Sequence, residues 1–197
     1  MSLGTFHSVW RTLGLWSRGL AASALLATGL AAAEPTNYGD PGAQELALKA
    51  RFTIELAMSI KFPMAKVPSV PFTIAVVGES PFHDELEVYA KGRLIQGRAI
   101  RIIKSSRLPE AQACDLLFIC RSEKPRVRAI VAWARYQGIL TVAEGEDMAR
   151  LGVMVNLMVE DTLKVGLNRR ALEEEGFTIG AQILQVARIL VPSKSSS

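Results

Sequence analysis

Few residues of this chain have the types and spacing that chemistry requires. His83 is the single histidine beyond residue 33, so that part of the chain holds no histidine pair for catalysis and no multi-histidine metal site. Glu144, Glu146 and Asp147 offer oxygen atoms of the kind that hard cations bind. Acidic residues also gather at helix N-termini because of the helix dipole. We therefore expect no metal site and no catalytic residue.

Gly78 follows an apolar run, as do the glycines of phosphate-binding turns. No second or third glycine follows at the spacing that lets the backbone approach a pyrophosphate. The sequence therefore predicts no cofactor.

The two cysteines, Cys114 and Cys120, flank the apolar run at residues 115–119. If this run is a strand that rises about 3.3 Å per residue, their Cα atoms lie roughly 20 Å apart. A disulfide requires a Cα separation below about 7 Å. We expect no disulfide between Cys114 and Cys120, and we expect both to be small buried hydrophobic residues.

The first 33 residues have the order of regions found in a secretory signal peptide. They contain no acidic residue, they carry Arg11 and Arg18 ahead of the apolar stretch at residues 20–33, and they end in three alanines. This pattern predicts cleavage between Ala33 and Glu34 and location in the periplasm. The apolar stretch of about 14 residues is shorter than the roughly 20 of a membrane span, so a retained anchor is the weaker alternative. No cysteine follows it as a site for a lipid.

Charge and length limit what the rest of the chain can be. Two of the 23 basic residues lie in the predicted signal peptide, so 21 basic residues face 19 acidic ones. This balance predicts no nucleic-acid binding. The remaining 164 residues suit one compact domain. Residues 34–43, rich in proline and glycine, are expected to form a flexible lead-in, and residues 192–197 a disordered tail.

The pattern between these ends alternates strands and helices. Strands are predicted at 72–78, 99–104, 116–120, 139–143, 153–159 and 162–167, and helices at 45–62, 81–90, 124–136, 145–150, 169–175 and 180–191. Unbroken apolar runs are typical of strands buried on both faces. The last two strands are separated by Glu160-Asp161 and predict an antiparallel hairpin. The fold class is therefore α/β, a three-layer α/β/α sandwich whose mainly parallel central sheet has an antiparallel C-terminal hairpin at its edge. The last helix, apolar nearly all round, is expected to be well buried.

Several local motifs carry a resemblance to a known family. They are Ile74-Ala75-Val76-Val77-Gly78-Glu79-Ser80-Pro81-Phe82, Gly92-Arg93-Leu94-Ile95-Gln96-Gly97-Arg98, Cys114-Asp115-Leu116-Leu117-Phe118-Ile119 with Arg121-Ser122-Glu123, Ile139-Leu140-Thr141-Val142, and the closing Met154-Val155-Asn156-Leu157, Leu167-Asn168 and Gly176-Phe177 to Ala187. In this order they resemble the YfiR family of small periplasmic proteins, over residues 44–191. The chain departs from the family pattern at Ala143-Glu144, often Ser-Asp, and at Leu151-Gly152, often Gly-Gly.

The resemblance implies a regulator and not an enzyme. Relatives bind the periplasmic sensor domain of an inner-membrane diguanylate cyclase and lower cyclic-di-GMP output until another envelope protein draws them away. Others are encoded beside sensor kinases or outer-membrane receptors. The partner implied here is such a cyclase or kinase, with an outer-membrane lipoprotein or receptor as a further partner, and a homodimer stays open.

Two groups of polar residues are candidates for partner contact. Asn168, Arg169 and Arg170 stand where a strand passes into a helix, and Arg98 and Arg101 belong to a basic strand. A helix cap is the simpler role for Asn168, and a solvated face is the simpler role for the arginines. The alternative function is a small-ligand-binding module at the carboxyl ends of the parallel strands. Those ends are Gly78-Glu79, Arg121-Ser122 and Ala143-Glu144.

Overall fold

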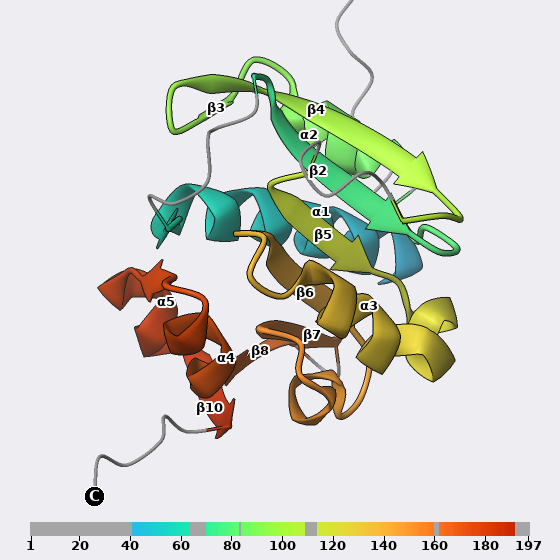
Figure 1. The fold of residues 1–197 in the computed structure, drawn as a ribbon. Coiled ribbons are helices and arrows are strands. Elements are labelled where there is room, and N and C mark those ends of the chain that lie inside the picture. The colour runs from blue at the N-terminus through green and yellow to red at the C-terminus, as the bar shows by residue number, and fades with distance from the viewer. Residues whose placement is uncertain (1–40, 64–69, 83, 109–113, 160–161, 192–197) are drawn as a thin grey trace, which may run out of the picture. The chain divides into compact units, whose positions relative to one another are not determined.

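The computed structural model describes residues 41–63, 70–82, 84–108, 114–159 and 162–191 (Figure 1). The predicted signal peptide, most of the predicted lead-in, His83 and the predicted tail lie outside these ranges. No helix in the described ranges combines the length and the hydropathy that crossing a membrane requires.

A mixed sheet of eight strands forms the middle of the fold, in the order β10-β8-β7-β6-β5-β2-β4-β3. Its strands are β2 (Phe72–Val77), β3 (Leu94–Ile95), β4 (Arg98–Ser105), β5 (Leu116–Ile119), β6 (Leu140–Glu144), β7 (Val155–Val159), β8 (Leu163–Asn168) and β10 (Ala187–Val191). The strands from β4 to β7 in this order are parallel, and β10 is parallel to β8. The β7–β8 hairpin and the β3–β4 pair are antiparallel. The predicted mainly parallel sheet with an antiparallel hairpin is confirmed, although β10 and not the hairpin forms the edge.

The central strands are buried on both faces, as their unbroken apolar runs predict. Every residue of β2, β5 and β6 is buried. Ile74 pairs with Leu116, and both belong to one hydrophobic cluster, whereas the next pair, Ala75 and Leu117, belongs to a second cluster. Because successive side chains of a strand point to opposite faces, these strands supply two hydrophobic cores.

Helices cover both faces of the sheet. The helices are α1 (Pro41–Ser59), α2 (Glu85–Ala90), α3 (Val127–Ala134), α4 (Arg169–Glu174) and α5 (Ala181–Val186), with the 3-10 helices η2 (Arg121–Arg126) and η3 (Met148–Leu151). Residues of α1, α2, α4 and α5 share one hydrophobic cluster, and residues of α3 and η3 belong to the other. Figure 1 shows α1 behind the sheet and α3 in front of it. The three-layer α/β/α architecture is confirmed.

The first helix begins and ends earlier than its sequence pattern predicts. It starts at Pro41, so residues 41–43 belong to the helix and not to the lead-in. The predicted helix at 45–62 is wrong in its last residues, because α1 ends at Ser59 and the short strand β1 (Ile60–Lys61) follows. This strand pairs with β9 (Thr178–Ile179) in a separate two-stranded sheet. The cause is tertiary pairing, which replaces the last helical turn.

Two helices of the middle region are shorter than predicted. The helix predicted at 81–90 begins only at Glu85, and Ser80 Oγ instead accepts a hydrogen bond from the Phe82 N–H at 3.3 Å. Phe82 turns inward and packs on Phe118, with 4.6 Å between ring centroids, so a helix cannot start there. The helix predicted at 124–136 is divided into η2 and α3, with Pro125 inside η2. Proline lacks the N–H of a regular helix. The predicted helix at 145–150 is the 3-10 helix η3.

The helix predicted at 180–191 is wrong in its second half. Helix α5 ends at Val186, and the chain continues as β10 beside β8. Gly166 makes this pairing possible, since a Cβ atom there would lie 2.2 Å from a methyl carbon of Leu190. The expected deep burial is also wrong, because Leu184 is 44% exposed and Ile189 is 45% exposed. An apolar pattern in this segment therefore supports a strand at the sheet edge.

A buried ion pair joins α1 to the end of β6. Lys49 Nζ lies 2.8 Å from Glu144 Oε2 and 2.6 Å from Glu45 Oε1. Glu144 Oε1 also accepts a hydrogen bond from the Arg121 N–H at 3.3 Å. Burial acts to lower the pKa of Lys49, but its hydrogen bonds to Glu144 and Glu45 outweigh burial and raise the pKa above its ordinary value. Lys49 therefore keeps its charge at neutral pH.

We expect Lys49→Met to lower the free energy of unfolding by about 3 kcal/mol at neutral pH, because it leaves Glu144 buried without its cation. The folded-state pKa of Lys49 is raised, so this stabilisation is complete below the unfolded pKa of about 10.4 and is lost as the pH rises through the folded value. Urea denaturation at neutral and at strongly alkaline pH measures the difference between variant and wild type.

The matched control is Arg51→Met, which removes an exposed ion pair on the same helix, Arg51 Nε to Glu55 Oε1 at 3.0 Å. It should cost less than about 0.5 kcal/mol. Equal losses in the two variants would contradict a special role of Lys49.

Candidate functional site

A surface cavity of about 240 Å³ lies where α3, η3, α4 and β10 meet. It contains two of the residues that the sequence marks for partner contact, Asn168 and Arg170. Its lining comprises Val131, Ala134, Arg135, Thr141, Ala149, Arg150, Gly152, Met154, Asn168, Arg170, Ala171, Glu174, Glu175 and Val191. Both apolar and charged side chains therefore border the cavity, and they come from segments 60 residues apart in the chain.

Asn168 holds the walls of this cavity together. Its Oδ1 accepts a hydrogen bond from the Ala171 N–H at 3.0 Å, which confirms the predicted cap of α4. Its Nδ2 donates to the Ala149 carbonyl oxygen at 2.9 Å, and its backbone N–H donates to the Met154 carbonyl oxygen at 2.9 Å. One buried side chain thus ties α4 to η3 and to the start of β7.

The acidic residues of the cavity are paired inside the domain. Arg135 Nη2 lies 3.2 Å from Glu174 Oε2, and Arg135 Nε lies 3.7 Å from Glu175 Oε1. The Tyr136 N–H donates to Glu175 Oε2 at 2.7 Å. These contacts join the end of α3 to the end of α4.

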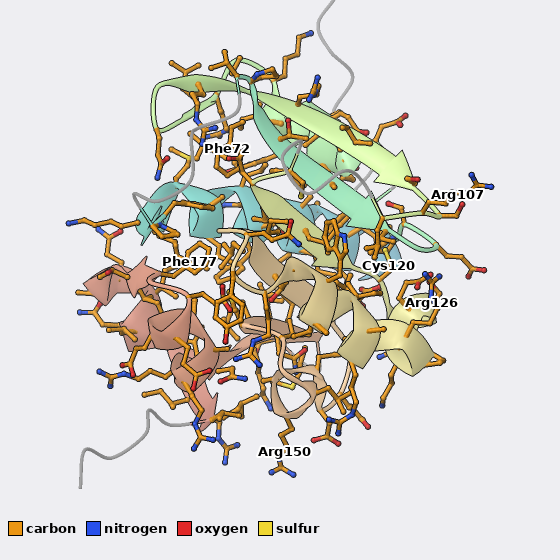
Figure 2. All side chains as sticks on the ribbon, viewed as in Figure 1. Phe72, Arg107, Cys120, Arg126, Arg150 and Phe177 are labelled. Carbon is orange, nitrogen blue, oxygen red and sulfur yellow. The ribbon has the colours of Figure 1, made fainter. Side chains whose placement is uncertain are left out.

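Two cations at the rim point outward. The Arg150 side chain is 75% exposed and lies 3.8 Å from Asp147, and Figure 2 shows it projecting away from the fold. Arg170 is exposed and forms no ion pair within the described ranges. The rim of the cavity can therefore attract an acidic group, either on a protein or on a small ligand.

The five predicted contact residues lie in two separate places. Asn168 and its neighbours stand at the β8–α4 junction, where Arg169 Nε binds Glu173 Oε1 at 2.8 Å. Arg98 and Arg101 lie on β4, five positions away from β8 in the strand order. Arg98 is nearly buried, with Nη1 3.2 Å from Asp115 Oδ1, so its charge is neutralised inside the domain. Arg101 is exposed and donates to Thr73 Oγ1 at 3.1 Å.

The carboxyl ends of the parallel strands bind one another. Ser122 Oγ accepts a hydrogen bond from the Glu79 N–H at 2.9 Å, and Glu144 bonds to Arg121 and Lys49 as described above. Gly78 has φ +98°, and a Cβ atom there would lie 2.5 Å from Ser122 Oγ. Close packing therefore accounts for the glycine at this turn.

The residues considered for metal binding do not come together. Glu144 faces Lys49, whereas the Asp147 side chain is exposed. Across the part of the chain that the structure describes, no group of three or more His, Cys, Asp or Glu side chains is arranged to hold a metal ion.

Both cysteines are buried and free. Cys114 Sγ donates to the Leu116 carbonyl oxygen at 3.0 Å. Burial, with smaller effects from the carboxylates of Glu144, Glu123 and Glu79, raises the pKa of Cys120 to about 12. Since the thiolate is the reactive form, Cys120 is chemically inert at neutral pH.

Sequence reasoning missed most of the cavity. Arg135, Arg150, Glu174 and Glu175 line it, yet none stands in a local motif. The run of three acids at 173–175 signals pairing within α4, as Glu173 shows, but not the contact with Arg135.

The fold and this cavity define a small α/β domain with a surface suited to binding. The chain belongs to the YfiR/HmsC-like family, whose model matches residues 46–188. The predicted resemblance is confirmed, and the family is regulatory rather than catalytic. No curated protein matches the chain.

Solved structures share the fold at low identity. A crystal structure of the ABC domain in complex with L-Trp from Streptococcus pneumoniae has a TM-score of 0.52 and 14% identity over 70% of this chain. A conserved domain protein from Vibrio cholerae O1 biovar El Tor has a TM-score of 0.51 and 14% identity over 71% of this chain. The match spans 59% of each of those chains. These likenesses concern the fold alone.

We expect Asn168→Ala to lower the free energy of unfolding by about 2–3 kcal/mol. It removes the α4 cap, which is worth about 1 kcal/mol, and it leaves the Ala149 carbonyl without its donor. Asn168→Asp is the matched control, because it keeps the capping oxygen and loses only the amide donor. Urea denaturation should place its stability between those of wild type and Asn168→Ala. Wild-type stability in Asn168→Ala would show that these hydrogen bonds do not hold the cavity walls.

Proposed function

We propose that this protein is an exported periplasmic regulator that binds the sensor domain of an inner-membrane diguanylate cyclase and lowers cyclic-di-GMP output. The observation that carries the proposal is family membership over residues 46–188, nearly the whole described domain. The signal-like order of residues 1–33 supports export.

Repression needs no reaction at the cavity. A protein that binds the inactive arrangement of the sensor more tightly than the active one shifts the population toward the inactive form. A shift from 1:99 to 99:1 requires about a 10⁴-fold difference in affinity between the two forms. An outer-membrane lipoprotein or receptor that removes the regulator would reverse the shift.

The cavity rim is the surface we assign to contact with the cyclase. Arg150 and Arg170 stand exposed on η3 and α4, and Asn168 fixes these two elements to each other. An acidic patch on the sensor domain would complement this rim.

A second candidate function rests on the same cavity. A small ligand bound there would make the protein a ligand-binding module that feeds a sensor kinase or an outer-membrane receptor. The volume of about 240 Å³ lies below the roughly 300–1,000 Å³ of ordinary ligand pockets. The size of the cavity therefore favours contact with a protein surface.

Deletion of the gene should raise cellular cyclic-di-GMP, and the wild-type gene should restore the original level. The double variant Arg150→Glu, Arg170→Glu should restore it less well, because it reverses both exposed charges at the cavity rim. The matched control, Arg128→Glu on α3, changes another exposed arginine and should complement fully. Mass spectrometry of nucleotide extracts measures the messenger.

A variant that lacks residues 2–33 tests export in the same strain, and it should fail to complement. Unchanged cyclic-di-GMP after deletion, in cells that express a cyclase with a periplasmic sensor domain, would overturn the proposed function.

A further inference from the structure

The outer edge of β4 is open along most of its length. Only Arg98 and Ala99 pair with β3, whereas residues 100–105 pair with β2 on their inner side. No strand within the described ranges pairs with residues 100–105 on their outer side. A strand directs part of its N–H and C=O groups to each side, so this stretch presents backbone hydrogen-bonding groups to a further strand.

An apolar hollow lies beside this edge, between α2 and β4. Its volume is about 380 Å³, and its apolar lining comprises Ala90, Leu94, Ala99, Ile100 and Ile102. Leu94 is 55% exposed. The hollow can therefore receive apolar side chains from a strand that adds to β4.

The charges around the open edge have one sign. Arg101 is exposed on β4, Lys91 lies at the rim of the hollow, and neither forms an ion pair within the described ranges. Arg107 follows the end of β4, and Figure 2 shows it projecting outward. Lys104, in contrast, is neutralised by Glu87 at 2.7 Å. The edge is thus basic where it meets solvent.

The two faces of β4 differ in character. Ile100 and Ile102 pair with Phe72 and Ile74, whose side chains belong to the hydrophobic cluster on the α2 side. Arg101 pairs with Thr73 and points to the other face. A strand beside β4 would therefore meet an apolar hollow on one face and a cation on the other.

We infer that the outer edge of β4 binds an extended segment of a partner protein, which adds a ninth strand with apolar side chains toward α2 and acidic side chains beside Arg101. The inference rests on the proposed function, in which this protein binds another protein. A second copy of the chain is a poor occupant, because pairing of two such edges would bring their basic residues together.

Synthetic peptides test this surface without the natural partner. The probe is an eight-residue fluorescent peptide that alternates glutamate and valine. One control peptide replaces glutamate with lysine, and another replaces a central valine with proline, which keeps the charge but blocks strand pairing. Fluorescence anisotropy with the purified protein measures affinity, and hydrogen exchange reports protection of the amides at residues 100–105.

We expect the acidic peptide to bind at least about tenfold more tightly than either control peptide. Arg101→Glu should weaken its binding at least about fivefold, whereas Arg188→Glu, on the opposite edge strand β10, should change it less than about twofold. Thermal denaturation should show that both variants are folded. Equal binding of the proline peptide, or no effect of Arg101→Glu, would overturn the inference.

The result stands apart from the proposed function. Peptide binding at β4 without any change of cyclic-di-GMP on gene deletion would refute the regulator and keep the edge site. A change of cyclic-di-GMP without peptide binding would keep the regulator and refute the edge site.

Discussion

The hydrogen bonds of Asn168 determine how the last third of the chain can fold. This residue ends β8, begins α4, and bonds to the backbone of η3 and of the segment before β7. The cavity exists because these elements are held at fixed positions around one buried amide. The pairing of Arg135 with Glu174 and Glu175 then closes the wall between α3 and α4. Exposed cations at this rim are thus presented by a rigid frame, which limits the entropy lost on binding a partner.

The sequence predicts the layers better than the edges. Continuous apolar runs at β2, β5 and β6 have one stable solution, a parallel sheet covered on both faces. At the C-terminus the apolar residues after Gly180 fit either a helix or a strand. Their outcome depends on Gly166, which lies 20 residues earlier and lets Leu190 approach. The first turn of α2 fails for a similar reason, since Phe82 is drawn into the core against Phe118.

The candidate site could be predicted only where one residue acts locally. Asn168 precedes a helix, and its cap follows from residue type and position alone. Arg98 has the same sequence context as Arg101, yet the fold places it beside Asp115 and leaves Arg101 in solvent. Long-range pairs of this kind carry no local signal. The two basic surfaces, at the cavity rim and at β4, are likewise products of the topology, and they give the domain two separate places for contact.

The central claim is that this protein lowers the activity of a cyclase from outside the inner membrane. Reconstitution tests it most directly: purified protein is added to spheroplasts of the deletion strain, and their cyclic-di-GMP is measured against protein concentration. The account predicts a saturable fall in cyclic-di-GMP with wild-type protein and a weaker fall with the Arg150→Glu, Arg170→Glu variant. Constant cyclic-di-GMP at every protein concentration would contradict it.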